Sequence, residues 1–309
     1  MLRVLNSKRI IQLNPHIMAN QKEIRARIAS TISTQQITKA MKLVSATKLR
    51  KASDSIVRMR PYAEKLQGIM GNLQESSDDP LLAGYFKSRE AKKVLLLVVT
   101  SDRGLCGAFN ANVVKRVRML IQDNYAPANL TGSVTMMCIG KKGGEALKRL
   151  GIEVNLEMAN LSQTLSAETA FKAMQSVIDT FLLGEYDRVE VVYNKFKNAA
   201  TQILVNEQLL PIAPMKEKTT QKSSDYIFEP GKVEILQDLI PRSVKTLFYR
   251  SLLDSLASEH GARMVAMDKA TENAGELLRD LRLAYNQARQ AAITREISEI
   301  VGGVAALEG

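Results

Sequence analysis

The residue types best suited to chemistry lie in one short segment, residues 100–107, which reads T-S-D-R-G-L-C-G. It follows the apolar run Val94–Val99 and precedes a helix that we expect near residues 110–121. At such a junction the backbone N–H groups of the helix N-terminus can bind phosphate or lower the pKa of a thiol. Cys106 is therefore the candidate nucleophile, and a thiol enzyme is one hypothesis for the function.

The motifs that would support catalysis are missing from the sequence. Neither G-x-G-x-x-G nor a P-loop occurs, and the glycines of residues 140–144 have the wrong spacing for either. A phosphatase-like loop needs an arginine six positions after its cysteine, where this chain has Asn112. His16 and His260 are the only histidines, too few for a zinc site or a Ser-His-Asp triad. The favoured interpretation is a tight turn with a half-buried Cys106, and no catalytic residue, metal or cofactor.

Composition narrows the class of protein further. The 309 residues carry a net charge of +11 and 45% of them are hydrophobic, so we expect a packed core and an acidic partner. Cys106 and Cys138 are the only cysteines, which argues against a disulfide framework and favours a reducing compartment. The longest apolar run, Val94–Val99, has the length of a strand, so no segment is expected to span a membrane.

Strands and helices alternate around Cys106. We expect strands at residues 94–99, 133–139, 189–193 and 202–209, and a weaker strand at 152–156. Helices are expected at residues 110–121 and 166–183, and a short helix is expected to follow a glycine turn at residues 140–144 and to end at residue 150. This alternation predicts an α/β fold class, with a Rossmann-like, open and mostly parallel sheet over residues 92–214.

Long helices are predicted at both ends of the chain. Over residues 19–75 apolar residues recur every three to five positions, among them Val44, and ten Lys and Arg residues oppose two acidic residues between residues 20 and 60. Pro61 is expected to end or kink this helix. Residues 235–309 form a second helical pattern, which would reach roughly 110 Å at 1.5 Å per residue. The economical arrangement is an antiparallel coiled coil of the two helices, with the end of the second left unpaired.

The basic N-terminal region allows two further interpretations. Residues 1–18 contain Arg3, Lys8 and Arg9 without an acidic residue, which is typical of a mitochondrial presequence. The basic helix that follows could belong to a nucleic-acid-binding protein, but it has no interleaved aromatic residues. A solvated surface, or one that faces an acidic protein, is the favoured interpretation, with no nucleic acid bound.

Three segments together resemble a known family. They are K-E-I-R-x-R-I-A-S with Q-I-T-K-A-M-K-L-V near the N-terminus, S-D-R-G-L-C-G at residues 101–107, and A-R-Q-A-x-I-T-x-E-I-x-E-I from residue 288. In order and spacing they are similar to the gamma subunits, the central rotor stalks, of F-type ATP synthases. The resemblance covers nearly everything from about residue 19 onward.

The resemblance implies a fold, a function and partners. The coiled coil would stand among three alpha and three beta subunits, with the α/β domain at its foot on the c-ring and beside the small central-stalk subunit. The chain would couple proton-driven rotation of the c-ring to conformational change in the catalytic beta subunits. Its place would be peripheral, on the matrix side of the mitochondrial inner membrane or, alternatively, on the cytoplasmic face of a bacterial plasma membrane.

The family's contact residues match named positions of this sequence. Arg289, Gln290 and Thr294 match the part of the C-terminal helix that meets a loop of beta, and Met41 and Lys42 match the facing part of the N-terminal helix. Tyr226 and Glu229 match the foot surface that contacts the c-ring and the small stalk subunit. The C-terminal tip departs from the family, because it has two adjacent glycines where one is usual.

Overall fold

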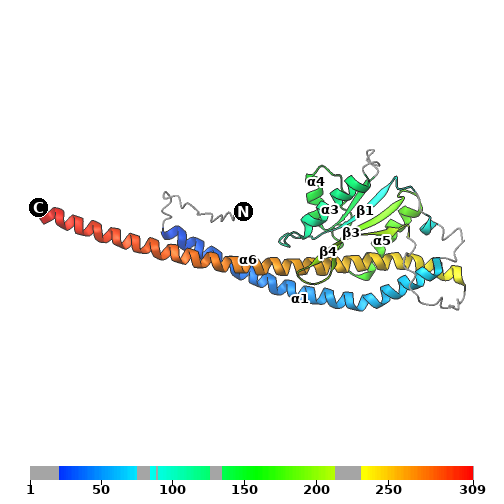
Figure 1. Cartoon of the computed structure of the whole chain (residues 1–309), viewed down its shortest axis with the longest axis horizontal. Coiled ribbons are helices and arrows are strands. Elements are labelled where there is room, and N and C mark those ends of the chain that lie inside the picture. Colours follow the sequence, from blue (N-terminus) through cyan, green and yellow to red (C-terminus); the bar gives the residue numbers. More distant parts are fainter. Residues whose placement is uncertain (1–20, 75–83, 88–89, 126–133, 213–230, 309) are drawn as a thin grey trace, which may run out of the picture. The chain divides into compact units, whose positions relative to one another are not determined.

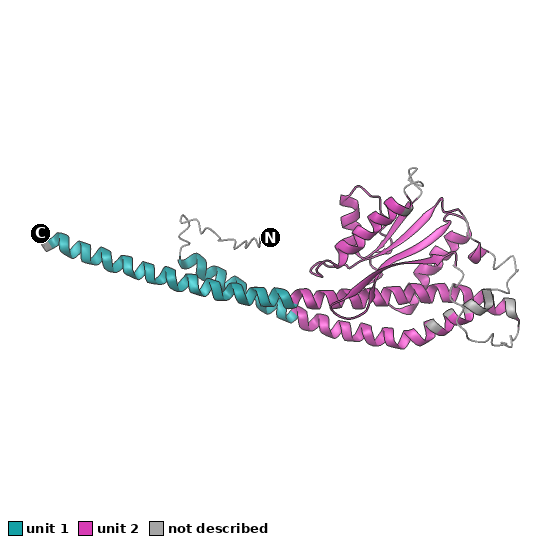
Figure 2. Ribbon diagram, viewed as in Figure 1, with its two compact units in different colours: residues 1–40, 268–309 teal, residues 41–267 magenta. Residues whose placement is uncertain are grey.

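The computed structural model describes residues 21–74, 84–87, 90–125, 134–212 and 231–308. The chain divides into two compact units: a terminal unit, residues 1–40 with 268–309, and an α/β unit, residues 41–267 (Figure 2). Two long helices contribute to both units, α1 (Gln21–Gln74) and α6 (Lys232–Glu308) (Figure 1). The long helices predicted from apolar periodicity are thus confirmed.

The α/β unit contains a four-stranded sheet in the order β2-β1-β3-β4. The strands are β1 (Val94–Val99), β2 (Val134–Ile139), β3 (Arg188–Phe196) and β4 (Gln202–Leu210). β1 pairs in parallel with β2 and β3, and β4 pairs antiparallel with β3, so the predicted mostly parallel sheet is confirmed. The connections contain α3 (Phe109–Asn124), α4 (Lys141–Arg149) and α5 (Ala167–Leu182), the last capped by Ser166 as the sequence suggested.

Both faces of the sheet are buried, because alternate side chains of each strand point to opposite sides. Leu95 and Leu97 of β1 belong to a core shared with α5 and with Phe248 of α6. Leu96 and Val98 belong to a second core, shared with α3 and α4. The first part of α6 therefore covers one face of the sheet, and apolar packing holds it there (Figure 1).

Within each unit, α1 and α6 pair in opposite directions. In the terminal unit Arg25 donates to the Tyr285 hydroxyl at 2.7 Å, and Gln35, ten residues later, donates to the Thr271 carbonyl at 3.3 Å. In the α/β unit Ala52 and Ile56 of α1 pack against residues 253 and 257 of α6. The small alanine side chains allow the close approach expected of the antiparallel coiled coil.

Pro61 was expected to end or kink the first helix, and the first of these outcomes is excluded. α1 does not end at Pro61 but continues to Gln74. Proline removes the hydrogen bond to the carbonyl four residues earlier, here that of Val57. Both residues are exposed, so water can hydrate that carbonyl and the helix tolerates the loss.

Two smaller predictions also need correction. Residues 152–156 form no strand and contribute only an isolated bridge, Met137 with Asn155. The glycines of residues 140–144 do not all lie in a turn, because α4 begins at Lys141 and contains Gly143. A Cβ on Gly143 would lie 2.5 Å from the Thr100 side chain, so this glycine allows α4 to pack closely against the end of β1.

Candidate functional site

The C-terminal part of α6 extends past its partner helix within the terminal unit. The Arg25 guanidinium lies over the Tyr285 ring, 5.6 Å from its centroid, and α1 begins only four residues before Arg25, at Gln21. From residue 289 to residue 307 every described side chain of α6 except that of Ala292 is exposed. This stretch, which we call the free end of α6, is the first candidate contact surface.

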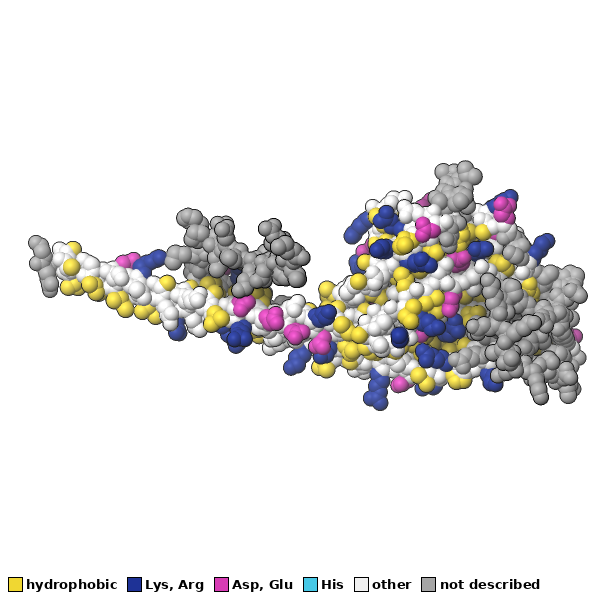
Figure 3. All heavy atoms as spheres, in the orientation of Figure 1, with side chains coloured by type: hydrophobic (Ala, Val, Ile, Leu, Met, Phe, Trp, Pro, Cys, Tyr) yellow, Lys and Arg dark blue, Asp and Glu magenta, His cyan; other side chains and the backbone are white. Residues whose placement is uncertain are grey.

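The free end carries both polar and apolar side chains. Arg289, Gln290 and Thr294, predicted from the sequence to contact a partner, are all exposed here. Along the same helix runs an exposed apolar row, visible in yellow in Figure 3, made of Ile293, Ile297, Ile300, Val301, Val304 and Leu307. Monomeric proteins rarely leave such a row uncovered, so the free end has the character of an interaction surface.

A second candidate surface lies on α1 in the α/β unit. Met41 and Lys42 are half-buried, and the Met41 carbonyl accepts a hydrogen bond of 2.8 Å from the Ser45 hydroxyl. The next two residues, Leu43 and Val44, are 64% and 57% exposed, so the prediction that Val44 packs in the coiled-coil stripe was wrong. Met41 and Lys42 belong to the α/β unit, whereas the free end of α6 belongs to the terminal unit.

The exposed side chains next to Leu43 and Val44 are mostly basic. Between residues 41 and 60 the only acidic residue is Asp54, against six Lys and Arg residues, five of them exposed: Lys48, Arg50, Lys51, Arg58 and Arg60. A surface that combines exposed apolar residues with this excess of positive charge is suited to an acidic protein partner. Tyr226 and Glu229, predicted to form a third contact surface, lie outside the described residues.

The turn at residues 101–107 does not support thiol catalysis. Cys106 is 2% exposed, more deeply buried than predicted, so a substrate in solution does not reach its sulfur. The Asn110 amide nitrogen lies 3.3 Å from this sulfur and the Ser101 hydroxyl 3.6 Å, and neither group is a general base. Burial raises the pKa of the other thiol, Cys138, to about 12, which keeps it protonated.

Sequence reasoning missed a polar cluster of α6 that holds this turn. Arg263 pairs with Glu259 at 2.6 Å, one helical turn earlier, and donates to the carbonyl oxygen of Arg103 at 3.0 Å. The turn it holds contains Leu105, 65% exposed and in the left-handed backbone region at φ 64°. The i,i+4 spacing of Glu259 and Arg263 in the sequence indicates an ion pair on one helix, but it does not indicate the contact of Arg263 with the loop that contains Arg103.

His260, within this cluster, makes stability depend on pH. Burial, with the charges of Arg263 and Lys48, lowers the pKa of His260 to about 4. Protonation is thus disfavoured in the folded state, and stability is lost as pH falls from about 6.5 toward 4. Between pH 7.5 and 5.0 we expect this group to account for a loss of about 2 kcal/mol.

Urea unfolding at the two pH values measures this loss, and His260→Gln is the control variant. Subtracting the pH dependence of the variant from that of the original chain removes the contribution of buried carboxylates such as Glu259, whose pKa is raised by burial. Equal pH dependence of both proteins would show that His260 is not held neutral.

Among the described residues, no group of three or more His, Cys, Asp and Glu side chains is arranged to hold a metal ion. None of the described helices is long and apolar enough to cross a membrane.

Comparison with known proteins agrees with the resemblance over nearly the whole chain. The sequence model of the ATP synthase family matches residues 20–307. The ATP synthase gamma chain of Cytophaga hutchinsonii is 56% identical over 293 residues, covering 94% of this chain and 99% of the relative. That of Flavobacterium psychrophilum is 53% identical, with 94% and 100% covered.

Solved structures with a similar fold come from the same kind of complex. A central stalk and c-ring structure of the Tetrahymena thermophila mitochondrial ATP synthase matches with a TM-score of 0.55 and 26% identity, covering 76% of this chain and 99% of that one. A Euglena gracilis mitochondrial ATP synthase chain shares the fold alone, with a TM-score of 0.64 and 21% identity over 93% of this chain and 94% of that one.

These matches decide between the hypotheses drawn from the sequence. They support the central-stalk function and give no support to a thiol enzyme or a nucleic-acid-binding protein. The mitochondrial location finds no support either, because the relatives of high identity are bacterial, which favours the bacterial alternative. By sequence identity along its whole matched length, the chain belongs to the ATP synthase gamma-chain family.

Proposed function

We propose that this chain is a mechanical subunit without catalytic groups of its own, which turns inside the catalytic head of a bacterial ATP synthase. The observation that supports this most is the free end of α6, where polar and apolar side chains are both left without cover in the terminal unit. A helix with exposed isoleucines at residues 293, 297 and 300 needs a surrounding apolar surface. A ring of alpha and beta subunits would supply it.

The mechanism follows from the lack of symmetry of the shaft. A shaft can change the conformation of a neighbour only if it contacts the neighbour's states differently. The apolar row has the spacing of a single helix face and so lies on one side of the free end of α6, which means that three identical beta subunits around this helix would each meet a different surface. On this proposal Arg289, Gln290 and Thr294 contact one beta loop, and Met41 and Lys42 lie near the beta region that transmits torque.

The same proposal gives α1 and the foot their partners. The lysines and arginines of residues 41–60 would pair with acidic residues of beta, which favours fast and correctly oriented assembly. Tyr226 and Glu229 would contact the c-ring and the small central-stalk subunit. The chain would be peripheral, on the cytoplasmic face of the plasma membrane, as its bacterial relatives suggest.

Rotation of a single labelled complex tests the proposal. Both native cysteines are buried, so a cysteine introduced by Lys115→Cys on the exposed side of α3 can be labelled selectively with a bead. In a complex of this chain with alpha and beta subunits fixed to a surface, we expect ATP to drive the bead in one direction, in three equal steps per turn. A complex that hydrolyses ATP while the labelled chain stays fixed would refute the proposal.

A further inference from the structure

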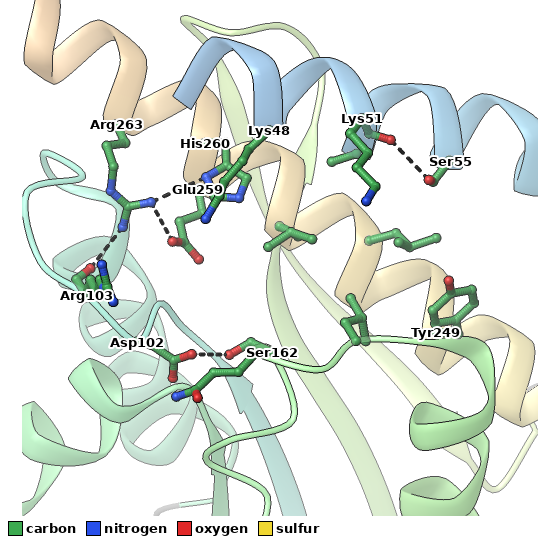
Figure 4. Close-up of a pocket in the computed structure, with 15 residues that line it drawn as sticks. Lys48, Lys51, Ser55, Asp102, Arg103, Ser162, Tyr249, Glu259, His260 and Arg263 are labelled. Atoms are coloured by element: carbon green, nitrogen blue, oxygen red, sulfur yellow. Dashed lines mark hydrogen bonds and ion pairs between the residues drawn. The ribbon is translucent and has the colours of Figure 1, made fainter. Parts of the chain in front are cut away.

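The α/β unit contains a cleft beside the basic surface of α1, residues 41–60, and Lys48 and Lys51 belong to both. Its volume is about 620 Å³, and three parts of the chain form its walls: α1 on one side, α6 on another, and the loops around residues 102 and 162 on the third (Figure 4). This volume lies within the range of small-molecule sites.

The acidic groups at the charged end of the cleft already have partners. The Asp102 carboxylate accepts a hydrogen bond of 2.6 Å from the Ser162 hydroxyl and one of 3.3 Å from the Lys141 backbone N–H. Glu259 is paired with Arg263. The second terminal nitrogen of Arg263 is also engaged, because it donates to the carbonyl oxygen of Arg103.

Three further cations of the cleft have no ion pair or side-chain hydrogen bond within the part of the chain that the structure describes. Lys48 and Lys51 come from α1 and Arg103 from the opposite loop, and all three are exposed. In Figure 4 the Lys51 side chain extends from α1 into the cleft. Burial is the main cause of the lowered pKa of His260, and the positive charges of Arg263 and Lys48 lower it further. Together these groups favour an anion.

The other end of the cleft is apolar. Its lining there consists of Ala52, Leu165, Leu253, Leu256 and the ring of Tyr249. In Figure 4 Arg263, Glu259 and Arg103 lie at one end of the cleft and Tyr249 at the other, and Lys51 lies on α1 between these two ends. A small inorganic ion would fill only the charged end, and a neutral hydrocarbon would leave the cations unpaired.

We propose that this cleft, lined by the cations Lys48, Lys51 and Arg103 and by the apolar residues Leu253, Leu256 and Tyr249, binds an amphipathic organic anion, a carboxylate on an apolar chain. The cations of the wall attract the carboxylate, and the chain lies along the leucines. This inference goes beyond the proposed rotation and does not depend on it, because the site is complete within the α/β unit.

Isothermal titration of the full-length chain with decanoate, below its micelle-forming concentration, tests this site. Each methylene group that becomes fully buried tightens binding about fourfold, so we expect decanoate to bind at least tenfold more tightly than hexanoate. Decyltrimethylammonium has the same chain with the opposite charge, and we expect it not to bind at the site.

Matched variants locate the site. Lys48→Gln with Lys51→Gln should weaken decanoate binding about tenfold, because two solvent-exposed ion pairs are lost. The control, Lys87→Gln with Lys115→Gln, removes the same charge from exposed positions outside the cleft and should leave the affinity unchanged. Both variants change exposed side chains, and a circular dichroism melt verifies that they fold.

Four results would overturn the proposal: no decanoate binding, equal weakening by the two double variants, equal affinity for decyltrimethylammonium, or equal affinity for hexanoate. A soluble glutamate-rich peptide that binds as tightly as decanoate would also overturn it and assign the cleft to an acidic protein segment. None of these results bears on whether the chain rotates, so failure of the site and failure of the proposed function are distinguishable.

Discussion

We expect the double substitution Arg289→Ala with Gln290→Ala to reduce ATP synthesis by the assembled complex at least tenfold. In the proposed function these side chains hydrogen-bond a beta loop during rotation, and one charge-assisted hydrogen bond contributes about 1.5–3 kcal/mol. If that contact is made only in the state that drives catalysis, its loss raises the free-energy barrier of ATP synthesis. The rate of synthesis then falls about tenfold for every 1.4 kcal/mol that is lost. Both side chains are exposed on α6, so the free energy of unfolding should change by less than about 0.5 kcal/mol.

Proton-driven ATP synthesis in reconstituted vesicles measures the effect, with denaturant unfolding of the isolated chain beside it. The matched control is Arg118→Ala with Gln122→Ala, which removes the same two side-chain types from exposed positions of α3 in the α/β unit. Synthesis should survive the control. Unchanged synthesis in the Arg289 and Gln290 variant would remove these residues from the torque-transmitting contact, and a large loss of stability would assign them a role in folding instead.

The sheet was predictable because its strands are encoded locally. The six residues of β1 are all apolar, as required of a strand covered on both faces, and all six are buried. Ser166 with Thr169 caps α5 through reciprocal hydrogen bonds that involve residues only three positions apart. The weak strand predicted at residues 152–156 does not form, because only Asn155 pairs with the edge of β2, through a single bridge.

Apolar periodicity was less reliable for burial on the long helices. The stripe predicted that Val44 faces a partner helix, yet within its unit this side chain is 57% exposed. The isoleucines at residues 293, 297 and 300 are also about half exposed or more, on the end of α6 that was expected to stay unpaired by its own chain. Apolar periodicity indicates that a helix face is buried by a partner, but it does not indicate whether that partner belongs to the same chain.

The cluster around Arg263 was beyond sequence reasoning for a different reason. Arg263 and Arg103 are 160 positions apart, and only the packing of α6 beside the sheet brings the guanidinium to that carbonyl oxygen. Cys106 illustrates the reverse case, since its segment left a reactive junction open as an alternative to a tight turn, and the turn buries the sulfur. Contacts between distant segments therefore decided which polar residues are available for function.

The largest loss of stability is expected from Gly140→Ala, at about 3–5 kcal/mol. Gly140 has φ 92° and ψ 135°, a conformation that residues with a side chain rarely adopt. An added Cβ would also overlap the carbonyl oxygen of Thr100. Thr100 cannot easily move, because its backbone N–H donates to Ile139 at 2.8 Å and its hydroxyl accepts from the Gly143 N–H at 3.1 Å. The substitution therefore strains the junction of β1, β2 and α4 as well as the local backbone.

Gly151→Ala separates these two contributions. Gly151 also has a positive φ, 76°, but no atom outside its immediate neighbours lies within 4 Å of the position of an added Cβ. Its substitution should therefore cost only the backbone strain, about 1–2 kcal/mol. Urea unfolding followed by far-ultraviolet circular dichroism measures both variants under one condition. If the two substitutions cost the same, the close contact with Thr100 does not hold α4 against the sheet. If Gly140→Ala costs at least about 2 kcal/mol more, the close approach of the added Cβ to Thr100 accounts for the difference.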